Sequence, residues 1–301
     1  MLAWYQNLSL GIDPIAFSMG FVFVRWYGIL YCMGFLVGYF FLRWRIKNIR
    51  LNKGFQFFNS QDVSSQEDGA ISEQVLEKKF EEKMQSILLD FLLVIFLFAL
   101  IGGRIGYVFF YDPAYFFAHP LSIISPFDLN GTFRGIFGMS YHGALLGALL
   151  GSFLFLKKRK ISFFAWADFV APAIPLGYFF GRIGNFLNGE LYGRATNSFV
   201  GMYFQSDLGR LRHPSQLYEA LLEGLFLFLI LWKFDKKKMR KGLLFSFYLI
   251  GYGLVRILVE FFRQPDAQIG LLLGFFSMGQ VLSLVMIFFG FFLVVLIRSK
   301  K

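Results

Sequence analysis

The sequence is poor in charge. Of its 301 residues only 16% are Asp, Glu, Lys or Arg, whereas 56% are hydrophobic. Soluble domains carry about 25% charged residues, so this composition excludes a soluble globular enzyme, and it equally excludes a disordered or collagen-like chain. Apolar runs recur along the chain, and a helix of about 20 apolar residues crosses the hydrocarbon core of a bilayer. The composition therefore predicts a polytopic membrane protein.

Cysteine and histidine are also scarce. The single cysteine, Cys32, lies in an apolar run, which excludes an intramolecular disulfide and predicts a small buried side chain rather than a nucleophile. The three histidines are far apart and no His-Glu-x-x-His motif occurs, so we expect no metal site. P-loop and dinucleotide-binding motifs are absent as well, and we expect no cofactor. The N-terminus lacks a basic region followed by a cleavage site, which predicts no cleaved signal peptide.

Seven stretches of the chain are long and apolar enough to be membrane spans. They cover roughly residues 19–42, 87–111, 137–156, 163–187, 217–232, 243–262 and 277–297. Lys and Arg gather after the first, third, fifth and seventh stretch. By the positive-inside rule these clusters are cytoplasmic, and most of the net charge of +11 lies in them. The expected fold is therefore all-α, with about seven transmembrane helices, the N-terminus outside and the C-terminus cytoplasmic.

The chain as a whole, residues 1–301, is expected to form one membrane-embedded domain. Residues 52–86 are polar and mixed in charge and end in a helix-prone stretch at 73–83, so we expect a cytoplasmic insertion with a short surface helix. Residues 188–216 are expected to form a segment at the outer face. The transporter signature of an inverted internal repeat is absent.

Ionisable side chains inside spans cost about 3 kcal/mol each on the milder scales and mark functional sites by default. With the expected topology, the polar side chains in the spans converge on the outer half of the membrane or its outer surface. They are Tyr27, Arg104, His142, Arg182, Glu190, Glu219 and Glu260. Residues placed at random would divide between both halves, so the convergence predicts a polar cavity that opens near the outer leaflet.

Structural roles compete with functional ones at several of these positions. Arg256 and Glu260 are four residues apart on one helix face, so they are as consistent with a structural ion pair as with a catalytic one. His142 is either a functional residue or a satisfied interfacial histidine. Two other patterns are interpreted as structural only: Gly143, Gly147 and Gly151 predict close packing against a neighbouring helix, and Asp168 is expected to be the N-terminal acid of its own helix.

The combination of arginines, a histidine and carboxylates suits an anionic lipid headgroup. Guanidinium groups bind phosphate through two hydrogen bonds, and Arg182 or Arg256 could stabilise the charge that develops on a phosphate leaving group. An imidazole titrates near neutral pH, so His142 is a candidate general base. These residues alone predict either a phospholipid-processing enzyme or a lipid or anion transporter, with a structural scaffold as a third possibility. The missing inverted repeat and the clustering on one side argue against transport.

A long motif narrows the choice. The run GRIGNFLNGELYGR at residues 181–194 resembles the signature of the bacterial prolipoprotein diacylglyceryl transferases. Further blocks are similar to that family in the same order. They are RWYG at 25–28, GGRIGYVFFY from 102, SYHGALLG from 140, HPSQLYEALLEG from 213 and RILVEFFRQPDAQ from 256. The resemblance covers nearly the whole chain.

The resemblance implies a seven-span enzyme of the bacterial inner membrane with its active site near the outer leaflet. It implies transfer of the diacylglyceryl group of phosphatidylglycerol to the thiol of the lipobox cysteine in a prolipoprotein signal peptide, the first step of lipoprotein maturation. A thioether forms and glycerol phosphate leaves, with no cofactor, no metal and no nucleic acid involved. Beyond these substrates and the membrane lipids no partner is expected, and the protein is expected to be a monomer.

The family's functional positions fall on eight residues. By similarity, the catalytic residues are Tyr27, His142, Glu190, Arg256 and Glu260, and the phosphatidylglycerol-binding residues are Arg182, Asn185 and Gly193. The role of His142 as base toward the thiol is our own hypothesis, since a thiol of pKa about 8.5 needs only modest help. Two features depart from the family: the insertion at 52–86 is longer, and the segment at 196–212 is shorter than in some members. The second departure bears on how the prolipoprotein is held.

Overall fold

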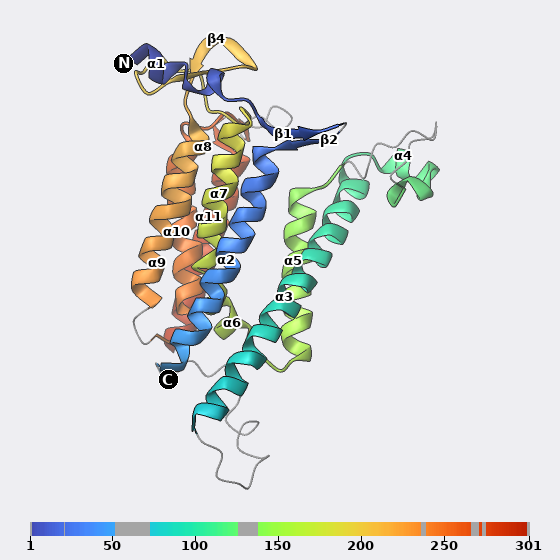
Figure 1. The fold of residues 1–301 in the computed structure, drawn as a ribbon, viewed down its shortest axis with the longest axis vertical. Helices are drawn as coiled ribbons and strands as arrows, with labels where there is room; N and C mark the ends of the chain where they lie inside the picture. Colours follow the sequence, from blue (N-terminus) through green and yellow to red (C-terminus); the bar gives the residue numbers. More distant parts are fainter. Residues whose placement is uncertain are drawn as a thin grey trace. The chain divides into compact units, whose positions relative to one another are not determined.

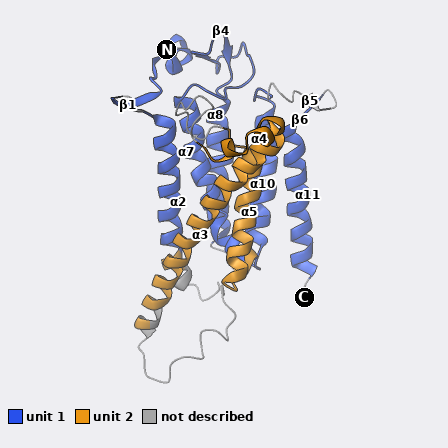
Figure 2. Cartoon of the chain, turned by 90° about the vertical axis from the view of Figure 1, so that its right-hand side faces the viewer, with its two compact units in different colours: residues 1–45, 164–301 blue, residues 46–163 orange. Residues whose placement is uncertain are grey.

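The computed structural model describes residues 2–20, 22–51, 73–125, 138–235, 239–265, 271–272 and 275–299. They are mostly helical and form two compact units (Figure 2). The first unit consists of residues 1–45 and 164–301, and the second of residues 46–163.

The first unit is a helical bundle with short strand pairs at one end (Figure 1). Its helices are α1 (Leu2–Gln6), the 3₁₀ helix η1 (Leu8–Gly11), α2 (Trp26–Leu51, which ends in the second unit), α6 (Phe163–Val170), α7 (Ala173–Leu187), α8 (Ser215–Tyr218), the π-helix η3 (Glu219–Phe226), α9 (Leu227–Asp235), α10 (Leu243–Glu260) and α11 (Met278–Ser299). Its antiparallel strand pairs are β1 (Ile15–Met19) with β2 (Val22–Arg25), β3 (Met202–Phe204) with β4 (Asp207–Arg212), and β5 (Leu271–Leu272) with β6 (Phe276–Ser277).

An apolar cluster attaches the strand end of this unit to α7. Phe186, Met202 and Phe204 are buried together, and the N-terminal segment packs against them. Hydrogen bonds hold that segment in place: the Tyr5 hydroxyl donates to the Val200 carbonyl at 3.1 Å, and the Ser9 hydroxyl donates to the Tyr203 carbonyl. The residues that follow α7 are thereby fixed between the bundle and the strands.

Two glycines bring α10 and α11 close together along their length. A Cβ atom on Gly253 would lie 2.8 Å from the Ser283 carbonyl oxygen, and one on Gly290 would lie 2.7 Å from Ile250 Cγ1. Small residues allow such approach between membrane helices, where dispersion contacts rather than hydrophobic exclusion drive association.

The second unit is built on α3 (Glu73–Phe110) and α5 (Tyr141–Lys158), with α4 (Pro113–Ala118) and the 3₁₀ helix η2 (Pro120–Ile123) between them. Figure 2 shows α3 and α5 side by side. A Cβ on Gly143 or Gly147 would collide with the backbone carbonyls of Gly102 or Phe98 on α3. The predicted close packing by glycines is therefore present.

The helix α3 corrects the expectation of a separate surface helix at 73–83. That stretch is the first part of one continuous 38-residue helix. Charged residues there lower the hydropathy without lowering helix propensity, so the helix extends past its apolar part. The rest of the expected insertion, residues 52–72, lies outside the described residues.

Among the described residues, four helices are long and apolar enough to cross a membrane, or up to five if the bent pair of α6 and α7 is one span. The four lie in α2, α3, α10 and α11. The expected span at 217–232 is a continuous helical stretch that changes from α to π and back to α. The chain is thus a multi-pass membrane protein, and the number of seven spans stays a prediction.

Two single-residue expectations are corrected. Cys32 is exposed on the surface of α2 rather than buried. Asp168 does not cap its own helix, because it lies near the C-terminal end of α6. Its carboxylate accepts hydrogen bonds from the backbone N–H groups of Gly242 at 2.6 Å and Phe245 at 2.7 Å, so it caps α10 instead.

The same end of the bundle holds a buried guanidinium. Arg45 on α2 is 1% exposed, donates to the carbonyls of Asp168 and Phe169, and forms an ion pair with Asp235 at the end of α9. Arg45 and Asp168 together connect α2, α6, α9 and α10. These contacts fix one end of α2 and of α10, and the other ends of these two helices carry Tyr27 and Arg256.

We expect Asp168→Asn to lower the free energy of unfolding by about 1–3 kcal/mol, because a neutral amide is a weaker acceptor for the two buried N–H groups. The change should appear as a lower Tm of the detergent-solubilised protein. Asp90→Asn is the matched control: Asp90 pairs with Arg159 at 2.6 Å on the surface, and losing an exposed pair should change the stability by less than about 1 kcal/mol. Equal losses in both variants would contradict the capping role.

Candidate active site

Six charged side chains meet inside the first unit, between α7, the π-helix η3 and the end of α10. The arginine–glutamate cluster consists of Arg182, Arg256, Arg263, Glu219, Glu223 and Glu260. Three arginines face three glutamates, so the formal charges of the cluster balance. All six side chains are mostly buried, and those of Glu219 and Glu223 are 0% exposed.

Glu219 lies at the centre of the cluster. Its Oε2 atom is 2.9 Å from Arg182 Nε and 3.0 Å from Arg256 Nη1, and it accepts a hydrogen bond from the Tyr178 hydroxyl at 3.0 Å. The guanidinium of Arg182 also lies over the Tyr178 ring, 4.7 Å from its centroid. Glu219 therefore bridges arginines from two helices.

Arg256 joins the remaining carboxylates. Its Nη2 atom is 3.0 Å from Glu260 Oε2, and its Nη1 atom is 3.5 Å from Glu223 Oε1. Arg263 extends the cluster, with Nε 3.7 Å from Glu219 Oε1 and Nη1 3.9 Å from Glu260 Oε2. A buried charge is tolerated only when it is paired and hydrogen-bonded, so each member depends on its partners.

Local sequence spacing explains part of this geometry. Glu260 follows Arg256 by four residues, which places both on one face at the end of α10, and Arg263 lies three residues beyond the end of that helix. Glu219 and Glu223 are both in the π-helix, whose hydrogen bonds join residues five apart rather than four. π-helical segments are rare and frequent at functional sites.

A second network extends from Arg182 into the loop after α7. Arg182 Nη1 donates to Asn185 Oδ1 at 3.3 Å, and Asn185 Nδ2 donates to Glu190 Oε1 at 2.9 Å. The Glu190 backbone is held from both sides, because its N–H donates to the Asn185 carbonyl at 3.1 Å and its carbonyl accepts from Gln216 Nε2 at 2.6 Å. The predicted residues Arg182, Asn185 and Glu190 thus form one connected chain.

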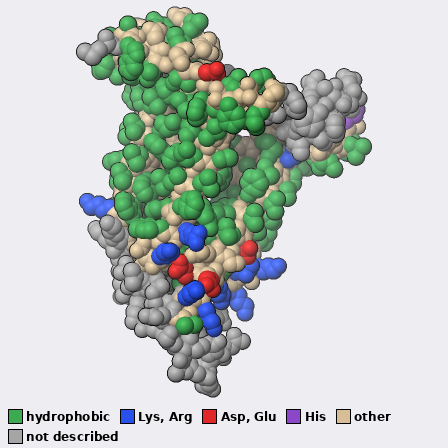
Figure 3. All heavy atoms as spheres, viewed as in Figure 1, with side chains coloured by type: hydrophobic (Ala, Val, Ile, Leu, Met, Phe, Trp, Pro, Cys, Tyr) green, Lys and Arg blue, Asp and Glu red, His purple; other side chains and the backbone are tan. Residues whose placement is uncertain are grey.

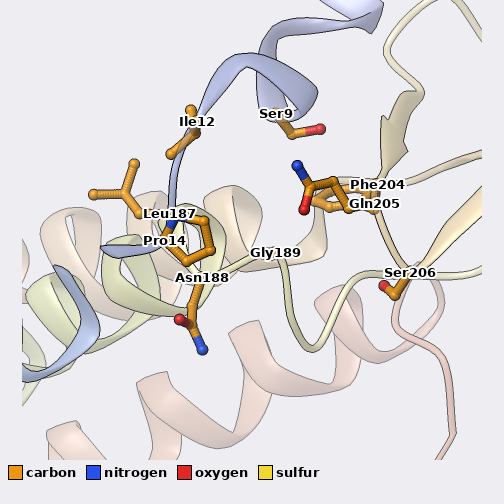
Figure 4. Close-up of a pocket in the computed structure, with 9 residues that line it drawn as sticks. All are labelled: Ser9, Ile12, Pro14, Leu187, Asn188, Gly189, Phe204, Gln205 and Ser206. Carbon is orange, nitrogen blue, oxygen red and sulfur yellow. The ribbon is translucent and has the colours of Figure 1, made fainter. Parts of the chain in front are cut away.

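The other side of this loop borders a cavity of about 180 Å³ (Figure 4). Its walls come from the N-terminal residues Ser9, Ile12 and Pro14, from residues 187–189 and from residues 204–206. Gly189 in this loop has a positive φ of 68°, a conformation that favours glycine. The chain can therefore turn sharply between Asn185 and Glu190.

Gly193 has a steric role in the structure. Its N–H donates to the His213 carbonyl at 2.8 Å, and a Cβ atom there would collide with the Phe262 carbonyl oxygen. Gly193 therefore lets the loop after α7 pass between the segments that lead into α8 and out of α10. Burial lowers the pKa of His213, which keeps its imidazole neutral at pH 7.

Tyr27 and His142 lie on other helices. Tyr27, at the start of α2, packs against Gly184 of α7, where a Cβ atom would be 3.4 Å from Tyr27 Cα. Its ring lies 4.4 Å from that of Tyr31. His142 is exposed in the first turn of α5. Ser140 caps the N-terminus of this helix, because its hydroxyl accepts a hydrogen bond from the Gly143 N–H at 3.3 Å. His142 belongs to the second unit, and its catalytic role stays a prediction.

Four members of the site were given no catalytic or binding role from the sequence, although Glu219 was in the polar set expected near the outer face. Glu219 and Glu223 are four residues apart in a predicted span, and that spacing was a usable signal. Arg263 and Tyr178 carried none, because their partners come from other helices. Arg104 behaves differently from the expected polar set: it donates to the carbonyls of Ser122, Ile123 and Gly138 and holds a loop of the second unit.

Comparison with known proteins identifies the family of the chain. The family described as prolipoprotein diacylglyceryl transferase matches residues 14–62 and 69–296. Relatives named phosphatidylglycerol–prolipoprotein diacylglyceryl transferase include the protein of Chlorobaculum tepidum, which is 42% identical over 99% of this chain and 93% of its own length. The protein of Geobacter sulfurreducens is 40% identical over 96% of this chain and 97% of its own length. The protein of Aliarcobacter butzleri is 39% identical over 97% of this chain and 97% of its own length. The chain therefore belongs to the prolipoprotein diacylglyceryl transferase family.

Proposed function

We propose that this chain transfers the diacylglyceryl group of phosphatidylglycerol to the lipobox cysteine thiol of a prolipoprotein signal peptide, as the first step of bacterial lipoprotein maturation. The observation that carries the proposal is the buried arginine–glutamate cluster in a member of this transferase family. Arginines in a low-dielectric site bind a phosphate headgroup strongly and can stabilise charge as it develops. No cofactor or metal takes part in this proposal.

The lipid headgroup binds at Arg182 in our proposal. Arg182 is the most exposed of the three arginines, with a side chain 16% exposed against 10% for Arg256 and 14% for Arg263. It can therefore exchange part of its contact with Glu219 for the phosphate. Asn185, already bonded to Arg182, orients the guanidinium, and Gly193 acts by admitting the loop that carries Glu190.

The reaction breaks the bond between the diacylglyceryl carbon and the phosphate oxygen. The cysteine sulfur attacks that carbon and forms the thioether, and glycerol phosphate departs with the bonding electrons. Arg182 and Arg256 stabilise the charge that develops on its oxygen. His142 accepts the thiol proton, because the thiolate is the reactive form. Glu260 holds Arg256, while Tyr27 and Glu190 complete the catalytic set.

The site faces the outer leaflet of the bacterial inner membrane in this proposal. Arg256 is 13 residues beyond the first residue of α10, Leu243, or about 20 Å along the helix at 1.5 Å per residue. The basic residues Arg240, Lys241 and Arg298 lie at the opposite end, where Arg240 donates to the carbonyl of Ile297. Figure 3 shows Lys and Arg gathered toward one end of the visible face. The positive-inside rule then supports an outward-facing site.

A direct assay tests the proposed reaction. Purified protein is incubated with phosphatidylglycerol micelles and a lipobox peptide, and the products are analysed by mass spectrometry. The peptide should gain one diacylglyceryl group, and glycerol phosphate should appear in equal amount. A protein that moves lipid or anions without covalent chemistry would produce neither, and that outcome would overturn the proposal.

We expect Arg182→Ala to lower kcat/KM at least about 100-fold, because it removes charge at the developing phosphate and leaves Glu219 with one ion-pair partner fewer. Arg159→Ala is the matched control, since Arg159 pairs with Asp90 on the surface of the second unit, and its turnover should equal that of the wild type. Membrane insertion of both variants is checked by extraction and gel filtration. Wild-type turnover in Arg182→Ala would contradict the assignment of the headgroup site to Arg182.

We also expect His142→Gln to lower kcat/KM at least about 100-fold, because a glutamine side chain cannot accept the thiol proton as the proposed base does. The measurement is kcat/KM for the wild type and His142→Gln. If kcat/KM is unaltered in His142→Gln, another group is the base.

A further inference from the structure

The carboxylate of Glu260 lies directly against a glycine on the neighbouring helix. Gly279 is in the first turn of α11, which begins at Met278. A Cβ atom at this position would lie 2.7 Å from Glu260 Cδ and Oε2 and 2.8 Å from Oε1. Real Cβ atoms essentially never come within 3.0 Å of a non-bonded heavy atom. The Glu260 carboxylate can therefore occupy its observed position only because residue 279 has no side chain.

The start of α11 is itself held in place. The Ser277 N–H donates to Gln280 Oε1 at 3.0 Å, and the Gln280 N–H donates to Ser277 Oγ at 3.2 Å. This reciprocal pair is a capping box, and both side chains are buried. The first turn of α11 is therefore held in a fixed position, and the N-terminal end of this helix attracts negative charge.

The Glu260 side chain is enclosed between the first turn of α11 and the guanidinium groups of Arg256 and Arg263. It is 2% exposed, and its Oε2 atom is 3.0 Å from Arg256 Nη2. From these contacts we propose that Gly279 is a positioning residue of the transferase: it admits the Glu260 carboxylate against α11 and so sets where Glu260 holds the Arg256 guanidinium. The inference rests on the proposed function, which assigns Arg256 and Glu260 to the active site.

The surroundings of Gly279 make the effect separable from folding. An added methyl group there meets the end of a flexible side chain, which can rotate away. At Gly193 it would instead meet a backbone carbonyl, and at Gly290 on the same helix it meets the Ile250 side chain and the Ser246 carbonyl. Gly279→Ala should therefore move a carboxylate rather than a helix.

The test measures kcat, KM and Tm for five variants of the full chain in detergent. They are Gly279→Ala, Gly290→Ala, Glu260→Gln, Glu260→Asp and the double variant Gly279→Ala with Glu260→Asp. We expect Gly279→Ala to lower kcat at least about tenfold with a Tm near that of the wild type, because displacing a catalytic group by about 1 Å can cost about 100-fold. Gly290→Ala, whose methyl group meets the Ile250 side chain and the Ser246 carbonyl rather than a charged group, should instead lower the Tm, so it shows the result that a displaced helix gives.

The double variant separates positioning from simple damage. Aspartate is shorter by one methylene, about 1.5 Å, so its carboxylate can leave room for the new methyl group. We expect the double variant to lose less activity than the product of the two single losses, a coupling that independent sites do not produce. If the losses simply multiply, or if Gly279→Ala retains wild-type kcat, Gly279 has no positioning role.

The Glu260→Gln variant distinguishes a failure of the positioning role of Gly279 from a failure of the proposed active site. If Glu260→Gln has wild-type kcat, the assignment of Glu260 to the active site is wrong, and the inference about Gly279 is overturned with it. If Glu260→Gln is inactive while Gly279→Ala is unaffected, the proposed site stands and only the positioning role is lost. Inactivity of both, with coupling in the double variant, supports both.

Discussion

The structure of the first unit depends on the pairing of three arginines with three glutamates away from water. Removing one partner from a buried pair leaves an uncompensated charge, which costs about 3–5 kcal/mol. The pairs join different helices: Glu219 of η3 contacts Arg182 of α7 and Arg256 of α10. The relative positions of these helices are therefore coupled to the ionic contacts, and the bundle cannot shift without breaking them.

Sequence reasoning reached part of this arrangement. The spacing of Arg256 and Glu260 and of Arg182 and Asn185 is set by a single helix, and the structure brings each pair together. The partners of Glu219 could not be predicted in the same way, because contacts between helices depend on how each helix is rotated about its axis. A π-helix makes this harder, since it changes the direction of side chains within one span.

Two of the expectations that failed concern features of a helix that a hydropathy pattern does not show. A hydropathy profile locates apolar stretches, but helix formation depends on backbone hydrogen bonds and propensity, so α3 continues to Glu73 through charged residues. Asp168 is expected to cap its own helix, because local sequence does not show capping between helices. Its carboxylate instead accepts a hydrogen bond from the N–H of Gly242 at the N-terminus of α10, 74 residues later in the chain. The resemblance to the family named residues on distant segments, such as Arg182 and Arg256, which periodicity within one helix cannot relate to each other.

The balance of charge in the cluster also bears on turnover. A diester headgroup brings one negative charge, and the departing glycerol phosphate carries more. A site with three unpaired arginines would bind that product more tightly than the lipid, and tight ground-state binding does not raise kcat. In the proposed site, the glutamates that already pair with the arginines offset this preference, because they can pair with the guanidinium groups again as the product leaves. A neutral, tightly paired cluster therefore suits an enzyme that must release a phosphate better than an open cationic pocket does.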